Sequence, residues 1–177
     1  DAFIVESRTM RKTLEQVTAV AGTPSNVLLL GEPGTGKETL ALHIHIRSAR
    51  HYRPLVIVKC AKSGSDPEHE LFGSESGEET VLGRWQLASD ATLLLDEVGE
   101  LSRRAQDRLV ASIDEAGQSD GGAVRIIATS SRDLENDVRS GRFSERLFDR
   151  LSVFMLRVPA LRERPEDVPP LAAHFLA

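Results

Sequence analysis

The stretch Val27-Leu28-Leu29-Leu30-Gly31-Glu32-Pro33-Gly34-Thr35-Gly36-Lys37 decides the fold. Residues 27–30 are apolar throughout, as in a strand that is buried on both faces, and a glycine-rich turn leads from them into a helix. The spacing of residues 31–37 is that of a phosphate-binding loop, whose backbone N–H groups surround an anion while the lysine supplies a cation. A tight turn without a ligand is the plainer interpretation, but the position between strand and helix disfavours it.

The composition indicates one globular domain over residues 1–177, with 40% apolar and 28% charged residues, and excludes disordered and fibrous proteins. The formal net charge of −5 disfavours direct nucleic-acid binding, so we expect DNA contact only through another domain. The longest apolar runs, residues 27–30 and 55–58, are too short for a membrane span. The single cysteine, Cys60, fits a cytoplasmic protein without disulfides.

Strand and helix candidates alternate along the chain. Further strands are expected at residues 55–59, 92–96, 124–129 and 153–158, and helices at 103–116 and 133–139. This alternation predicts an α/β fold with a five-stranded parallel sheet, helices on both faces, and ligands at the carboxyl ends of the strands. The last helix is expected to start near Glu166 or Asp167 and carries apolar residues without a partner. We therefore expect the chain to be the α/β part of a larger domain whose C-terminal helical lid is missing.

Two acidic residues follow the apolar residues 93–95. Asp96 and Glu97 suit the ligand edge of the sheet, where Asp96 would hold the shell of Mg²⁺ and Glu97 would orient a water for attack on the terminal phosphate. After the loop lysine stand Glu38 and Thr39, and either meets the metal directly or through water. A strand that runs into an acidic turn is the plainer interpretation.

The chain resembles the AAA+ central domain of bacterial sigma-54-dependent transcription activators of the NtrC type. The resemblance covers nearly the whole chain and includes residues 31–38, 70–73, 92–99, 132–134 and 159–164. It implies a P-loop α/β/α sandwich that binds ATP and Mg²⁺ through Gly31, Glu32, Pro33, Gly34, Thr35, Gly36, Lys37, Glu38 and Thr39. It also implies self-assembly into a ring, usually a hexamer, that acts on RNA polymerase holoenzyme with sigma-54.

Two loops depart from the family pattern. The family's Gly-Ala-Phe-Thr-Gly-Ala loop, which touches sigma-54, is replaced by the shorter residues 74–83, which lack the aromatic side chain. The companion loop is reduced to residues 118–123. We therefore expect the usual contact with sigma-54 to be lost.

The ATP site departs at three positions. Lys59 replaces the asparagine that gates the catalytic glutamate, and we expect its ammonium group to pair with Glu97 and lower its basicity. The sensor asparagine becomes Ser131, which is shorter and less able to reach the terminal phosphate. Of two arginines that the family sends into the neighbouring subunit's site, the first aligns with Ser144 and only Arg150 remains.

Three arginines offer a substitute for the missing one. Arg142, Arg146 and Arg150 share one face if residues 141–151 are helical, and Arg146 would then replace the lost arginine. An exposed helix surface is the plainer interpretation.

The sequence leaves two main hypotheses open. The first is an ATP-binding, weakly hydrolysing AAA+ domain of a transcription regulator, with catalytic Glu97, Asp96, Arg150 and Ser131 and with Asp96 and Glu38 at the metal. The alternative is a nucleotide-responsive oligomerisation module that no longer contacts sigma-54. A small-molecule P-loop enzyme is disfavoured because the sequence offers no second substrate pocket.

Overall fold

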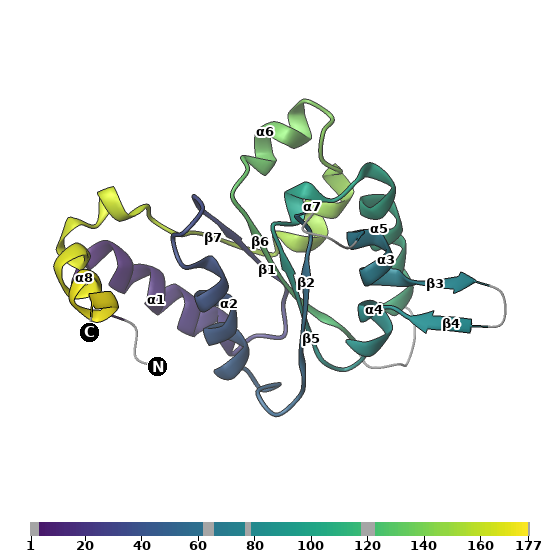
Figure 1. Ribbon diagram of the computed structural model, residues 1–177, viewed down its shortest axis with the longest axis horizontal. Coiled ribbons are helices and arrows are strands. Elements are labelled where there is room, and N and C mark those ends of the chain that lie inside the picture. The colour runs from purple at the N-terminus through teal and green to yellow at the C-terminus, as the bar shows by residue number, and fades with distance from the viewer. Residues whose placement is uncertain (1–3, 62–65, 77–78, 118–122, 177) are drawn as a thin grey trace.

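A five-stranded parallel sheet runs through the centre of the molecule (Figure 1). This computed structural model describes residues 4–61, 66–76, 79–117 and 123–176. The strands are β1 (Val27–Leu30), β2 (Leu55–Lys59), β5 (Thr92–Asp96), β6 (Arg125–Ser130) and β7 (Phe154–Arg157), in the order β2-β5-β6-β1-β7. Every neighbouring pair is parallel, which confirms the predicted sheet and brings the carboxyl ends of β5, β6 and β1 to one edge.

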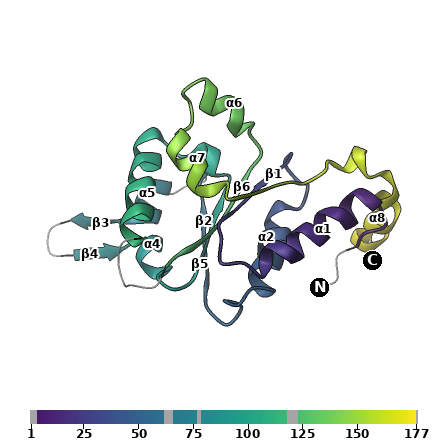
Figure 2. The same cartoon turned by 180° about the vertical axis from the view of Figure 1, so that it is seen from behind.

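Helices cover both faces of this sheet, as Figures 1 and 2 show. The described helices are α1 (Arg8–Ala21), α2 (Lys37–Ile46), α3 (Pro67–Phe72), α4 (Arg84–Leu87), α5 (Arg103–Ala116), α6 (Leu134–Arg139), α7 (Glu145–Leu151) and α8 (Val168–Leu176), with short 3₁₀ turns η1 (Val98–Glu100), η2 (Leu161–Glu163) and η3 (Pro165–Asp167). A hairpin of β3 (Gly73–Ser76) and β4 (Glu79–Leu82) projects at the end of the molecule opposite α1 and α8. None of the helices in the described ranges is long and apolar enough to cross a membrane.

Alternate residues of the central strands pack into two separate hydrophobic cores, one on each face of the sheet. Val27 and Leu29 of β1 pack with α1 and α2, whereas Leu28 and Leu30 pack on the side of α3, α5 and α7. Because side chains alternate between the two faces of a strand, a strand covered on both faces must be apolar at every position. This is why residues 27–30 form an unbroken apolar run.

The arginine face expected over residues 141–151 is not formed. Gly141 has a φ of 71°, and Ser144 caps α7, its hydroxyl accepting a hydrogen bond from the N–H of Leu147 at 3.4 Å. Arg142 therefore precedes the helix, so the condition for one face shared by all three arginines is not met, and only Arg146 and Arg150 lie on α7.

A buried arginine closes the end of α1. Arg125 is 2% exposed, and its guanidinium donates to the carbonyl oxygens of Val20 at 3.1 Å, Ala21 at 3.3 Å and Ser25 at 3.2 Å. The last carbonyls of a helix have no partner within the helix, and a cation there also interacts favourably with the helix dipole. Arg125 thus attaches the C-terminal end of α1 to β6.

We expect Arg125→Met to lower the free energy of unfolding by about 2–4 kcal/mol, because three buried carbonyl groups would lose a charged donor. Urea denaturation measures this change. The matched control is Arg139→Met, since Arg139 is exposed on α6 and its replacement should change stability little. Equal losses in the two variants would contradict this role of Arg125.

Candidate functional site

The loop after β1 curves around an open space. Gly34 and Gly36 have φ angles of 76° and 95°, a region that residues with a side chain rarely adopt, and no heavy atom lies within 4 Å of the position that a Cβ would take at either. A Cβ on Gly31 would instead lie 2.8 Å from the carbonyl oxygen of Val158, directly after β7. The first glycine therefore packs against the sheet, and the other two shape the turn.

Lys37 stands at the centre of the site. The residue is 6% exposed, and its Nζ donates to the carbonyl oxygens of Gly31 at 2.8 Å and Glu32 at 3.1 Å, and to Ser131 Oγ at 2.7 Å. Glu97 Oε1 lies 3.2 Å from the same Nζ. A buried ammonium group is costly unless its donors are satisfied, and here the protein supplies all the acceptors.

Thr129 of β6 fixes the two acidic residues at the end of β5. Its hydroxyl donates to Asp96 Oδ1 at 2.7 Å and accepts from the N–H of Glu97 at 2.9 Å. Glu97 has a φ of 56° and a ψ of 53°, a left-handed conformation that is uncommon for a residue other than glycine. The strained backbone and its bond to β6 turn the carboxylate of Glu97 toward β6 and the loop.

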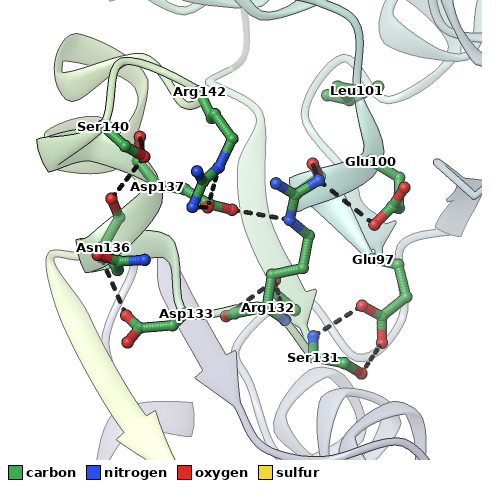
Figure 3. Close-up of polar contacts among 12 residues, drawn as sticks. Glu97, Glu100, Leu101, Ser131, Arg132, Asp133, Asn136, Asp137, Ser140 and Arg142 are labelled. Atoms are coloured by element: carbon green, nitrogen blue, oxygen red, sulfur yellow. Dashed lines mark hydrogen bonds and ion pairs between the residues drawn. The ribbon is translucent and has the colours of Figure 1, made fainter.

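Ser131 occupies both carboxylate oxygens of Glu97 (Figure 3). Its N–H donates to Oε2 at 2.7 Å and its hydroxyl to Oε1 at 2.5 Å. Burial alone would raise the pKa of Glu97, but these two hydrogen bonds and the positive charge of Lys37 hold it below its ordinary value. In this arrangement Glu97 is a weaker base than a free glutamate.

The expected pairing of Lys59 with Glu97 was wrong. Lys59 is an exposed side chain at the end of β2, level with Asp96, and no contact in the described part of the chain joins it to Glu97. The cation beside Glu97 is Lys37.

The arginines of α7 lie in a separate ion-pair cluster. Arg146 Nη2 is 3.1 Å from Asp114 Oδ2, and Arg150 Nη2 is 2.9 Å from Asp114 Oδ1, on α5. Arg142 pairs instead with Asp137 at 2.7 Å. The predicted catalytic Arg150 is therefore engaged with its own chain, apart from the cluster around Glu97.

The remaining predicted residues of the loop and the start of α2 differ in their exposure. Pro33, Glu38 and Thr39 are exposed, and Glu32 forms an exposed two-bond ion pair with Arg162, at 2.5 and 2.6 Å. Thr35 is buried, and its hydroxyl donates to the carbonyl oxygen of Glu32 at 2.8 Å.

The two loops that depart from the family pattern are only partly described. Residues 77–78 and 118–122 lie outside the described ranges, and the rest of residues 74–83 belong mainly to the β3–β4 hairpin.

An apolar pocket of about 500 Å³ lies directly beside the loop. Its lining comes from four parts of the chain: Ile4 and Val5 before α1 and Met10 on it, Gly34, Thr35, Gly36 and Thr39 of the loop and α2, Leu161 and Arg164 of the η2 region, and Val168, Leu171, Ala172, His174 and Phe175 of α8. Pockets of this size and character bind flat apolar ligands such as an aromatic base.

The residues present fit a nucleotide and a metal ion. The open turn at Gly34 and Gly36 leaves room for phosphate oxygens next to backbone amides and the start of α2, and the apolar pocket continues from it. Asp96 and Glu38 carry carboxylate oxygens, the ligand type that Mg²⁺ prefers. No group of three or more His, Cys, Asp or Glu side chains among the described residues could hold a metal ion, so Mg²⁺ here would take its other ligands from water and phosphate oxygens.

Comparison with known proteins identifies the family. The sigma-54 interaction domain family matches residues 3–157. The chain belongs to this family. Over 98% of this chain, the sequence is 44% identical to the transcriptional regulatory protein ZraR of Klebsiella oxytoca. Over 95% of this chain, it is 42% identical to the Nif-specific regulatory protein of Azotobacter vinelandii. It spans 42% and 35% of these two relatives, less than half of each.

Solved structures agree with the AAA+ P-loop fold of this sigma-54 interaction domain. The structure of NtrX from Brucella abortus in complex with ADP has a TM-score of 0.88 at 34% identity, and the match covers 98% of this chain and 41% of that one. The structure of the same protein in complex with ATP has a TM-score of 0.88 at 33% identity, over 99% of this chain and 42% of that one. The P-loop NTPase domain of a sigma-54 activator from E. coli has a TM-score of 0.63 at 20% identity, over 89% of this chain and 99% of that one, and supports the fold alone.

The sequence did not predict two residues of the site, Thr129 and Arg164. Thr129 supports both acidic residues, and a polar residue directly after the apolar residues 126–128 of β6 was the available signal. Arg164 is 7% exposed, and its Nη2 donates to the carbonyl oxygen of Thr35 at 2.9 Å. No local pattern marks Arg164 as a neighbour of the loop.

Asp167 joins the walls of the pocket. It is fully buried and accepts hydrogen bonds from the N–H groups of Glu6 at 2.6 Å and Ser7 at 2.7 Å, and from Ser7 Oγ at 2.8 Å. Arg164 Nη1 lies 3.8 Å from Asp167 Oδ2. Burial raises the pKa of Asp167, but the bonds from Ser7 and Glu6 outweigh burial and hold the pKa below its ordinary value.

We expect Asp167→Asn to lower the free energy of unfolding by about 1–3 kcal/mol at pH 7, because the donors would lose a charged acceptor. A carboxyl group whose pKa is depressed by folding stabilises the protein above its ordinary pKa, and this contribution is lost as pH falls through the folded value. Urea denaturation of both proteins should thus show the full difference at pH 7 and a shrinking one below the ordinary aspartate pKa. The exposed Asp149→Asn is the control, and a difference independent of pH would contradict the assignment.

Proposed function

We propose that this sigma-54 interaction domain binds ATP and ADP, with the phosphates at residues 31–37 and the base in the apolar pocket. The observation that carries the proposal is the continuity between the open glycine turn beside the buried Lys37 and the pocket of about 500 Å³. The structures of NtrX with ADP and ATP support it, because those chains share this fold at 34% and 33% identity.

We propose slow ATP hydrolysis at the same site. Asp96 and Glu38 would hold Mg²⁺, directly or through water, and a bound Mg²⁺ neutralises phosphate charge. Glu97 would orient the attacking water, and Ser131 lies within reach of both Glu97 and Lys37. Because Glu97 is hydrogen-bonded to Ser131 and paired with Lys37, it is a weak base, which supports low turnover.

Assembly is part of the proposal. We propose that copies of the chain form a ring, a hexamer in the whole protein, in which Arg150 contacts the neighbouring subunit's nucleotide and the ring acts on RNA polymerase holoenzyme. The family membership supports this role, as does the exposure of Arg150 at the surface of α7. DNA would be bound by another domain, and the protein would act in the cytoplasm.

Lys37→Ala should abolish nucleotide binding, since the loop would lose the cation that faces the phosphates and the partner of Glu97. Isothermal titration calorimetry with Mg-ATP and with ADP measures the affinity. The matched control, Lys12→Ala, removes an exposed lysine of α1 and should bind as the wild type does. Unchanged affinity in Lys37→Ala would reject the site.

Turnover per subunit should rise with protein concentration if the site is shared between subunits. Arg150→Ala should then reduce turnover strongly, on the order of 10³-fold for an arginine that stabilises the transition state, while ADP affinity stays the same. Phosphate release measures both, with Arg139→Ala as the exposed control.

Turnover near one per second or faster, on the order of a typical enzyme, would contradict the proposal of slow hydrolysis.

A nucleotide-responsive oligomerisation module is the second candidate. Two observations favour it: Ser144 is a helix cap where the family has an arginine, and Arg150 is paired with Asp114. The loop at residues 74–83, which is shorter than the family's sigma-54-contacting loop, also favours this second candidate. Capture of RNA polymerase holoenzymes separates the two candidates, because retention of the sigma-54 form supports the activator role and its absence supports the module.

A further inference from the structure

We propose that Ser131 is a positioning residue whose hydroxyl competes with nucleotide phosphates for Lys37 and restricts the positions at which water can bind Glu97. We call Lys37, Ser131 and Glu97 together the Ser131 clamp. The inference rests on the proposed nucleotide binding and goes beyond it, since it states that phosphates must break the clamp contacts in order to bind Lys37.

The donors of Lys37 show the competition. An ammonium group has three N–H donors, and they face Gly31 and Glu32 carbonyl oxygens and Ser131 Oγ at 2.7 Å, with Glu97 Oε1 sharing at 3.2 Å. The first two acceptors belong to the phosphate loop itself. A phosphate oxygen that binds Lys37 therefore has to replace the hydroxyl of Ser131 or the carboxylate of Glu97.

Most acceptor positions of Glu97 are occupied as well. Both carboxylate oxygens receive a hydrogen bond from Ser131, at 2.5 Å from the hydroxyl and 2.7 Å from the N–H. Hydrogen bonds to a charged group are about twice as strong as neutral ones. With Lys37 Nζ 3.2 Å from Oε1, these contacts fill three of the about four acceptor positions of the carboxylate, so a water that Glu97 is to orient has one position left, on Oε2.

The surroundings keep Ser131 in place. Ser130 accepts a hydrogen bond from the N–H of Gly31 at 3.2 Å, which holds the end of β6 against the loop. Arg132 follows Ser131 and donates to Asp137 at 2.7 Å (Figure 3). It also donates to the carbonyl oxygen of Gly99 at 3.1 Å. Because the backbone is anchored on both sides, the hydroxyl can be removed without moving the N–H donor.

The chemistry of serine suits this role. A hydroxyl accepts from Lys37 and donates to Glu97 through one oxygen atom, which alanine cannot do and a thiol does only weakly. Ser131→Ala therefore removes the hydroxyl contacts of the clamp and leaves the N–H bond to Glu97. Ser131→Thr keeps the hydroxyl.

The test compares ADP affinity by calorimetry in the wild type, Ser131→Ala and Ser131→Thr. We expect Ser131→Ala to bind ADP about 3- to 10-fold more tightly, the size of one net hydrogen bond, and Ser131→Thr to restore the wild-type affinity. Adenosine, which has no phosphate, should bind all three proteins equally. A merely structural serine would give weaker binding of both ligands when replaced.

Stability measurements complete the test. Ser131→Ala should lower the melting temperature more without ADP than at saturating ADP, because the clamp exists only in the first case. Ser140→Ala is the matched control: its hydroxyl donates to the carbonyl oxygen of Asn136 at 2.8 Å on α6, outside the clamp, and ADP affinity should not change. Ser131→Cys replaces the alanine variant if that variant does not fold.

The outcomes are distinguishable. Equal or weaker ADP binding by Ser131→Ala, with a wild type that binds ADP, overturns the clamp and leaves the proposed function intact. Failure of every protein to bind ADP overturns the proposed function, and the clamp with it. Binding by Ser131→Ala but not by the wild type supports both.

Discussion

The buried charge of Lys37 is the interaction on which the candidate site depends. Its ammonium group joins three pieces of chain that follow three different strands: the loop after β1, Ser131 after β6 and Glu97 after β5. In a poorly solvated environment such a cation is tolerated only while its acceptors stay in place. The position of the loop, the orientation of Glu97 and the end of β6 are therefore determined together.

This joint arrangement follows from the sheet order. β5, β6 and β1 are neighbours and parallel, so their carboxyl ends meet at one edge, although Leu30 and Ser130, the last residues of β1 and β6, are 100 positions apart in the sequence. Thr129, one residue before the end of β6, adds a polar bridge to Asp96 and Glu97. The polar residues of the site are thus confined to the ends of strands whose middles are apolar.

The sequence predicted the elements whose signals are local. The glycine turn between a strand and a helix, the four-residue β1 and α5 (Arg103–Ala116) are confirmed, because the pattern that predicts each one is contained in a single short segment. Partners in space were harder to predict. Lys59 and Glu97 lie at the ends of adjacent strands, yet the left-handed backbone of Glu97 turns its carboxylate to β6. The pocket lining was not predictable, since it combines segments more than 100 residues apart.

Asp167 has a consequence for the free energy of ligand binding. One carboxylate ties the backbone before α1 to the turn before α8, so two walls of the pocket are held together by the fold itself. A ligand that enters a preordered pocket loses less of its gross interaction energy to the restriction of mobile segments. Affinity for the apolar half of a ligand therefore depends on a residue that makes its contacts within the fold.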